Sequence, residues 1–313
     1  MADSNPSRLG QINGSGATDA LFLQKFAGEV LTTFSSVNVM MERHLVRTIT
    51  EGKSAQFPAT GIADAYDHTP GTELTGRSIK HAERILTLDG LIVSDVFIAN
   101  IDEAMNHYDV RSIYTTEVAR ALSKKMDKNV LQTAILAARA SAVITGNPGG
   151  TVLNAGAGVV TNSNGALRSA LFSAAQALDE KDVPEDSRFV VLKPAQYYTL
   201  VTDPLIPNRD YSANAGADIR TGKVWEVAGI DIVKSNNLPS TNVNTGNTKY
   251  QVDATNTVGV VMHPSAIGTL KLMDLAVEGE YQLSKQGTLI VAKYATGHGV
   301  LRPECAVEIT KSA

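Results

Sequence analysis

The sequence predicts an α+β fold, in which strands from distant parts of the chain meet in shared sheets. Three patterns support this prediction. Residues 115–141 have the apolar spacing of one long helix. Residues 53–88 are mostly polar, contain dispersed proline and glycine, and are typical of an extended hairpin. Strand-like residues recur as late as 305–310, far from the first strands.

The composition indicates a folded protein of two modest domains or one large one, and two linked lobes are expected. Its 313 residues are 43% hydrophobic and 19% charged, unlike a disordered chain. The formal net charge of −4 argues against a protein that neutralises many nucleic-acid phosphates. Simple solubility is the preferred explanation of this charge, and a local basic patch stays open.

Cysteine usage and hydropathy narrow the setting. Cys305 is the only cysteine, which excludes an intrachain disulfide and a thiol-rich zinc site and indicates a reducing compartment. Its apolar neighbours predict a buried side chain, and no nearby base is visible that would make it a nucleophile. No segment has the ~18 consecutive apolar residues of a membrane helix, and residues 1–11 lack a secretory pattern, so no membrane partner is expected.

The first 90 residues predict an arm and a hairpin. Residues 1–19 have the polar composition of a mobile arm, and residues 20–34 have the spacing of an amphipathic helix. Strand-like residues follow at 37–50. Two extended segments are predicted at 54–62 and 78–88, with the tip at 67–77. A hairpin this long cannot bury both faces against its own chain, so we expect it to lie on a neighbouring molecule.

Six charged residues in the hairpin region are the candidate contacts between subunits. One interpretation is an ordinary solvated surface. The other is a set of salt bridges between subunits, each contributing about 0 to 1 kcal/mol when exposed and acting on register and partner choice. The six residues are Lys53, Glu73, Arg77, Lys80, Glu83 and Arg84.

The long helix is the strongest prediction of local structure. It follows an apolar strand at 91–98 and a helical segment at 101–108. Thr115 is its expected N-cap, and Gly146 and Pro148 mark its end. At ~1.5 Å per residue it would be roughly 40 Å long. Its apolar positions are Val118, Leu122, Met126, Val130, Leu131 and Ile135.

Residues 146–164 show no helical period and are expected to connect into a second lobe of short helices and strands. Residues 235–249 are expected to be a polar surface excursion. The predicted helices are 166–178 and 194–201; the predicted strands are 188–192, 225–234 with a turn at Gly229, 257–263, 267–277, 281–294 and 305–310.

No catalytic, cofactor or metal site is predicted. Gly156 and Gly158 resemble the start of a dinucleotide-binding loop, but Thr161 stands at the third glycine position and a plain linker explains the segment. The six histidines are scattered without the spacing of a shared metal site. For His107 with Asp109, a contact at a helix start is a simpler explanation than a ligand pair.

Five strings stand out in the sequence: ALFLQKFAGEVLT at 20–32, GKSAQFP at 52–58, DEAMNHYDVRS at 102–112, MHPSAIGTLKL at 262–272 and IVAKYATGHGVLRPE at 290–304. These strings closely resemble the major capsid proteins of short-tailed bacteriophages of the T-seven type. The resemblance covers most of residues 20–304 and weakens between about 142 and 256. Long ordered strings make it specific.

The resemblance implies the Hong Kong phage capsid fold, with an N-terminal arm, an extended hairpin loop, a peripheral domain with a long spine helix, and an axial domain. In this sequence the arm and amphipathic helix would be 1–52, the hairpin 53–90, the peripheral domain 91–164 with 271–313, and the axial domain 165–270. The local patterns described above occur in the same order.

The resemblance also implies a function and partners. The chain would be a structural subunit that forms hexamers and pentamers of an icosahedral head, located in the virion, around double-stranded DNA that it does not read by sequence. A scaffolding protein and a portal would be further partners, with assembly in the bacterial cytoplasm. Two alternatives are a homo-oligomeric enzyme, which needs a convergent polar cluster, and a tail or decoration protein, which would show β-rich repeats. Neither pattern is visible.

Overall fold

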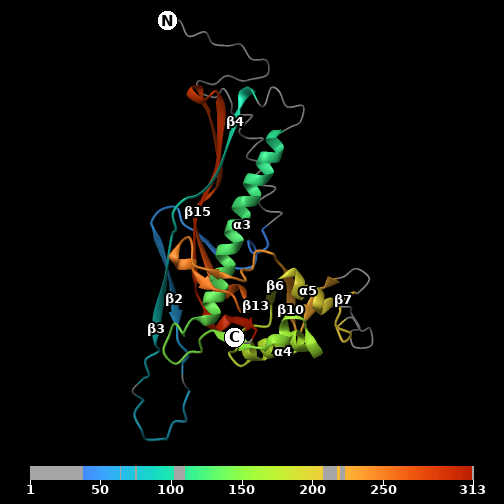
Figure 1. The fold of residues 1–313 in the computed structure, drawn as a ribbon. Coiled ribbons are helices and arrows are strands. Elements are labelled where there is room, and N and C mark those ends of the chain that lie inside the picture. Colours follow the sequence, from blue (N-terminus) through green and yellow to red (C-terminus); the bar gives the residue numbers. More distant parts are fainter. Residues whose placement is uncertain are drawn as a thin grey trace. The chain divides into compact units, whose positions relative to one another are not determined.

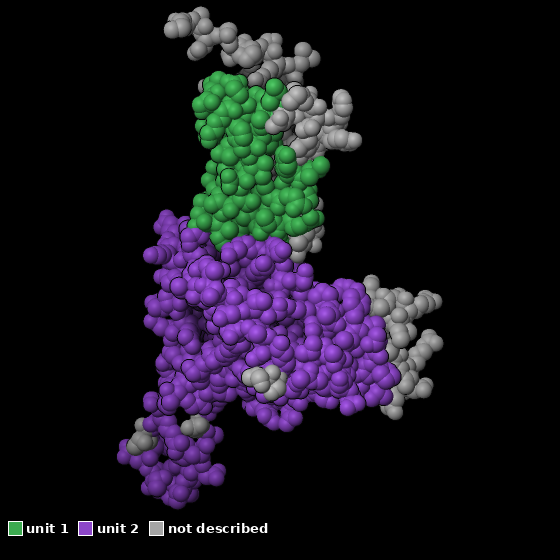
Figure 2. Space-filling model, viewed as in Figure 1, with its two compact units in different colours: residues 1–37, 91–123, 273–294 green, residues 38–90, 124–272, 295–313 purple. Residues whose placement is uncertain are grey.

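The computed structural model describes residues 38–63, 65–74, 76–101, 110–206, 217–218 and 223–311. The chain divides into two compact units (Figure 2). Among the described residues, unit 1 contains parts of Leu91–Ser123 and Met273–Tyr294, and unit 2 contains parts of Asn38–Gly90, Lys124–Leu272 and Ala295–Ala313. The predicted arm, the amphipathic helix at 20–34, and most of the helical segment at 101–108, including His107, lie outside the described residues.

Unit 2 contains a six-stranded sheet with the order β5-β16-β13-β6-β10-β9. Strands β6, β10 and β13 of this sheet are labelled in Figure 1. Central β13 pairs antiparallel with both β16 and β6, and every residue of β13 and β6 is buried. A valine-rich run without alternation is what a strand covered on both faces requires. The strands are β5 (Thr151–Asn154), β16 (Ala306–Thr310), β13 (Thr257–Met262), β6 (Phe189–Leu192), β10 (Ile230–Lys234) and β9 (Glu226–Val227).

Two helices of the second lobe form where they were predicted. Helix α4 (Ala166–Asp179) buries Leu167, Leu171 and Leu178 at helical spacing in the core of unit 2. Helix α5 (Pro194–Val201) begins with proline at its first helical position, where the missing N–H has no intrahelical partner to lose. The predicted strands at 188–192 and 257–263 and the turn at Gly229 are also confirmed.

The long helix is α3 (Val110–Arg139), and all six apolar positions of its predicted stripe are buried. The predicted N-cap is wrong, because the helix begins at Val110 and Thr115 lies inside it. A threonine cap contributes only about 1 kcal/mol. The backbone hydrogen bonds of the additional helical turn before Thr115 outweigh this contribution. The helix ends before Gly146, as predicted.

The hairpin is formed by β2 (Ser54–Thr60) and β3 (His81–Thr87), paired antiparallel from Ser54–Thr87 to Thr60–His81. Both extended segments are confirmed. The loop between them, 61–80, is longer than the tip predicted at 67–77, and the described residues in it beyond Gly61 are all exposed. These residues bury no cross-strand apolar pairs that would extend the ladder.

The last long strands differ from their predicted bounds. The turn between β14 (Ile267–Gln282) and β15 (Gly287–Val300) lies at Leu283–Lys285, after the gap predicted at 278–280. The ion pair of Glu278 with Lys293 of β15, 2.6 Å apart, explains the error, because a charge that breaks the apolar pattern is paired on the strand surface. These strands belong to a four-stranded sheet of order β1-β14-β15-β4.

Other elements are shorter or more ordered than predicted. The strand-like residues at 37–50 form only β1 (Leu45–Thr48), whereas β4 (Ile92–Ala99) forms as predicted. The segment at 146–164 is more than a connection, because its β5 pairs parallel with β16 and extends the six-stranded sheet.

That sheet contains strands from both predicted domain ranges, and the boundary between peripheral and axial domains stays a prediction. The remaining strands are β7 (Ala217–Asp218), β8 (Lys223–Val224), β11 (Asn242–Val243) and β12 (Val252–Asp253).

Candidate assembly surface

The six predicted contact residues all lie on or beside the hairpin of unit 2. Five of them are exposed and Arg84 is half-buried. Within the described part of the chain, none of the six forms an ion pair with another side chain. Glu83 and Arg84 are in β3, Glu73 and Arg77 are in the loop, and Lys53 and Lys80 adjoin the strands. The structure therefore leaves their charges available to a partner.

Local contacts position three of these residues without neutralising them. The Lys80 Nζ donates a hydrogen bond to the Thr145 carbonyl oxygen at 3.1 Å. The Arg77 guanidinium lies 4.0 Å from the centre of the Tyr66 ring, a cation–π contact. The Lys53 carbonyl oxygen accepts the Leu88 N–H at 2.8 Å, which closes the base of the hairpin.

A cavity of about 310 Å³ lies beside the hairpin in unit 2, lined by residues that include Phe57, Arg84, Ile144 and Arg302. The Arg84 Nε is buried and has no hydrogen-bond partner among the described residues. A buried donor without an acceptor is unfavourable in the isolated subunit. This cavity was not predicted, because its walls come from six separated parts of the chain.

A network missed by the sequence patterns holds the base of the hairpin. The Lys249 Nζ donates to the Thr87 carbonyl oxygen at 2.9 Å and lies 3.3 Å from the Asp89 carboxylate. The Tyr250 hydroxyl donates to the same carboxylate and accepts the His298 N–H at 2.9 Å. Lys249 and Asp89 are too far apart in sequence for any local pattern to have paired them.

Two of the scattered histidines meet in the interior of unit 2. The Thr269 hydroxyl oxygen lies 2.6 Å from His44 Nε2 and 2.8 Å from His298 Nδ1, and His44 Nδ1 lies 2.6 Å from the Met40 carbonyl oxygen. Burial lowers the pKa of His298 to about 3 and lowers the pKa of His44. Both rings are therefore neutral near pH 7 and act as structural hydrogen-bonding groups.

Cys305 is buried, as predicted. The Ser265 hydroxyl donates to its Sγ at 3.3 Å and lies 2.7 Å from His263 Nδ1, so a histidine is closer than the sequence indicated, but it contacts the thiol only through Ser265. Burial raises the pKa of the Cys305 thiol, which keeps it protonated. Among the residues that the structure describes, no three His, Cys, Asp or Glu side chains are grouped to hold a metal ion.

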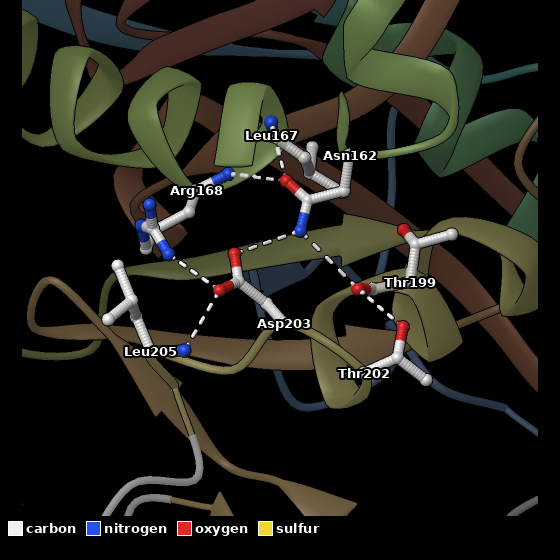
Figure 3. Close-up of polar contacts among 7 residues, drawn as sticks. All are labelled: Asn162, Leu167, Arg168, Thr199, Thr202, Asp203 and Leu205. Carbon is white, nitrogen blue, oxygen red and sulfur yellow. Dashed lines mark hydrogen bonds and ion pairs between the residues drawn. The ribbon is translucent and has the colours of Figure 1, made fainter. Parts of the chain in front are cut away.

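A polar cluster joins the start of α4 to the segment after α5 (Figure 3). The Asn162 Oδ1 accepts the N–H groups of Leu167 and Arg168, and its Nδ2 donates to Asp203 at 3.0 Å. The Arg168 Nη1 lies 2.6 Å from the other Asp203 oxygen, which also accepts the Leu205 N–H. These groups bind one another, so the cluster is a structural clamp.

None of the helices in the described ranges is long and apolar enough to cross a bilayer.

Comparison with known proteins identifies the family to which the chain belongs. The model of the Gp10A-like major capsid protein family matches residues 56–310. The chain belongs to this family. The resemblance seen in the five sequence strings and the predicted α+β capsid fold are both confirmed.

This major capsid protein is similar to relatives along nearly its whole length. The major capsid protein of Escherichia phage T7 is 37% identical over 320 residues, covering 92% of this chain and 90% of that protein. The capsid of cyanophage P-SCSP1u has a TM-score of 0.80 and 42% identity over 99% of both chains. The mature capsid of bacteriophage PhiM1, at 17% identity, shares the fold with a TM-score of 0.73 over 88% of this chain and 87% of that one. As a member of the family, the chain is a structural subunit of a phage head and is located in the virion shell.

Proposed function

We propose that this major capsid protein assembles with copies of itself into hexamers and pentamers that close into an icosahedral head around double-stranded DNA, with no catalytic role. The observation that supports the proposal is the exposure of charged and apolar side chains on the hairpin. The hairpin carries the six charged contact candidates, five of them exposed, together with apolar side chains such as Ile62 and Leu74, which are 76% and 66% exposed. An isolated two-stranded hairpin is marginally stable at best, so a second surface is expected to cover it.

Head-to-tail contacts between copies form closed rings when the rotation between subunits closes, and slight variation in the contacts allows rings of different size. The long loop of the hairpin supports such variation, because it has no ladder to fix its shape. The charged hairpin residues, which form no ion pair within the described part of the chain, then select the register of the neighbouring copy.

The proposal includes partners that rest on family membership alone. A scaffolding protein guides assembly in the bacterial cytoplasm, a portal occupies one vertex, and DNA enters without being read by sequence. The net charge of −4 supports loose containment of DNA over most of the inner wall.

Deleting residues 70–77 tests the role of the hairpin. The deleted residues lie in the exposed loop, beyond the last ladder pair of Thr60 with His81. The shortened chain is therefore expected to stay soluble and to unfold with the same urea midpoint as the full chain. It is also expected to form no closed shells by negative-stain electron microscopy. Normal shells from the folded deletion variant would overturn the hairpin assignment.

A further inference from the structure

A cationic groove lies in unit 2 beside α3. Its cavity of about 420 Å³ is bordered by α3, the residue before α5 and the polar segment at 236–250. Three lysines line it, Lys125, Lys128 and Lys193, and none of the lining residues described by the structure is acidic. The chain as a whole has a net charge of −4, whereas these lysines make the groove locally positive.

The helix geometry explains why these side chains converge. Lys125 and Lys128 are three residues apart and Asn129 and Gln132 continue the same face of α3, so four polar groups point into one groove. Lys193 approaches from the position that precedes α5. In the described part of the molecule, none of the three lysines has a carboxylate partner. Burial, and secondarily Lys311, lowers the pKa of Lys193.

Two amides line the groove beside the lysines. Asn129 and Gln132 are only 3% and 8% exposed, yet neither side-chain amide has a hydrogen bond to another described residue. Neither amide is among the side-chain groups that are fully buried without a partner, so their N–H groups reach the groove and can donate to a ligand there. Asp127 contacts the lining residue Asn237, but its carboxylate is already bonded to the N–H groups of Val39 and Met40.

We infer that this lysine groove binds the phosphodiester backbone of double-stranded DNA, an inference that rests on the proposed enclosure of DNA by the shell. Ammonium groups and amide N–H donors are the groups that contact phosphate oxygens without reading base sequence. A protein partner would be favoured by apolar contacts at the centre of the interface in addition to charge. The large apolar side chains of the lining, Leu238 and Tyr250, are themselves buried at 2% and 4% exposure.

Binding of a short fluorescent duplex to the full chain, measured by anisotropy across a salt series, tests the inference. The triple variant Lys125→Gln, Lys128→Gln, Lys193→Gln should bind every duplex sequence more weakly. Its log–log salt slope should be smaller by about 3, roughly one unit per phosphate contact. A control with the same change in charge, Lys124→Gln, Lys234→Gln, Lys285→Gln, changes exposed lysines outside the groove and should keep most of the slope.

Equal losses in the two triple variants would overturn the inference, because they would show a general effect of charge. Displacement of the duplex by polyglutamate at equal charge concentration would assign the groove to an acidic polypeptide and also overturn it. The single variant Lys125→Gln, with an expected slope change of about 1, repeats the test with the least risk to folding. Shell formation is scored separately. If the triple lysine variant forms intact shells and binds DNA as tightly as the wild-type chain, the inference about the groove is rejected alone. If the wild-type chain forms no shells, the proposed function is rejected.

Discussion

Arg139 and Glu308 form a bidentate ion pair, with Nε–Oε2 and Nη2–Oε1 distances of 2.7 Å each. Glu308 is fully buried in β16 and also accepts the Thr257 hydroxyl of β13. The pair therefore connects the end of α3 to two adjacent strands of the six-stranded sheet. Removing one partner from a buried pair destabilises a protein more than the pair itself stabilises it, because the remaining charge loses its compensation.

The substitution Arg139→Leu is expected to lower the free energy of unfolding by about 3 kcal/mol, since it leaves the Glu308 carboxylate buried and unpaired. Urea unfolding followed by circular dichroism measures the change. Arg120→Leu is the matched control on the same helix, because its partner Glu117 is 61% exposed and such pairs contribute at most about 1 kcal/mol. Equal destabilisation by both substitutions would contradict the role of Glu308.

Gly297 allows β15 to approach the base of the hairpin. A Cβ at this position would clash with the Thr87 carbonyl oxygen and lie 2.9 Å from the Leu88 Cα. Gly297→Ala is therefore expected to destabilise unit 2 by about 2 kcal/mol and to reduce shell formation, because overpacking shifts the backbone. Gly90→Ala, where a Cβ meets open space, should change neither property. A stable Gly297→Ala chain that forms shells normally would refute this account of the hairpin base.

The buried histidines predict loss of stability in mild acid. The pKa of His298 is lowered to about 3 and that of His44 is also lowered, so below about pH 6.5 the unfolded chain takes up protons that the folded chain excludes. Stability is thus fully present above the unfolded pKa and falls as the pH decreases. His298 alone accounts for about 2 kcal/mol between pH 7 and pH 5. Burial raises the pKa of Asp127, which acts in the opposite direction.

Urea unfolding at pH 7 and pH 5 measures this dependence. A His298→Asn variant should lose about 2 kcal/mol less than wild type over that interval, because it has no ring to titrate. His81→Gln, at an exposed position of β3, should retain the wild-type dependence. If the His298→Asn and wild-type chains show the same pH dependence, the histidine is not its source.

Periodic patterns allowed the helices and the hairpin to be predicted. The stripe from Val118 to Ile135 and the proline that opens α5 act within a few residues, so the sequence shows them directly. Strand order could not be predicted in this way, because β16 pairs with β13 and β5 through register contacts between distant residues. The misplaced turn before β15 had the same cause, since Glu278 forms its ion pair with Lys293 on the other strand.

The candidate site was predicted in part. The hairpin charges were identified as candidate contacts between subunits, and that role stays a prediction. The anchor of Asp89 with Lys249 and Tyr250 was missed, because no local signal relates residues so far apart. No role was predicted for the face of Lys125 and Lys128. Its sequence signal was the amides Asn129 and Gln132 at the next positions of that face, which an ordinary charged surface does not require.

The central claim is that the chain builds a closed shell. Negative-stain electron microscopy and sedimentation of the purified full chain, co-expressed with and without a candidate scaffolding protein, test it most directly. We expect closed round shells, tubes or rings of capsomers. A discrete small oligomer under every condition would contradict the claim and favour the alternative of a homo-oligomeric enzyme.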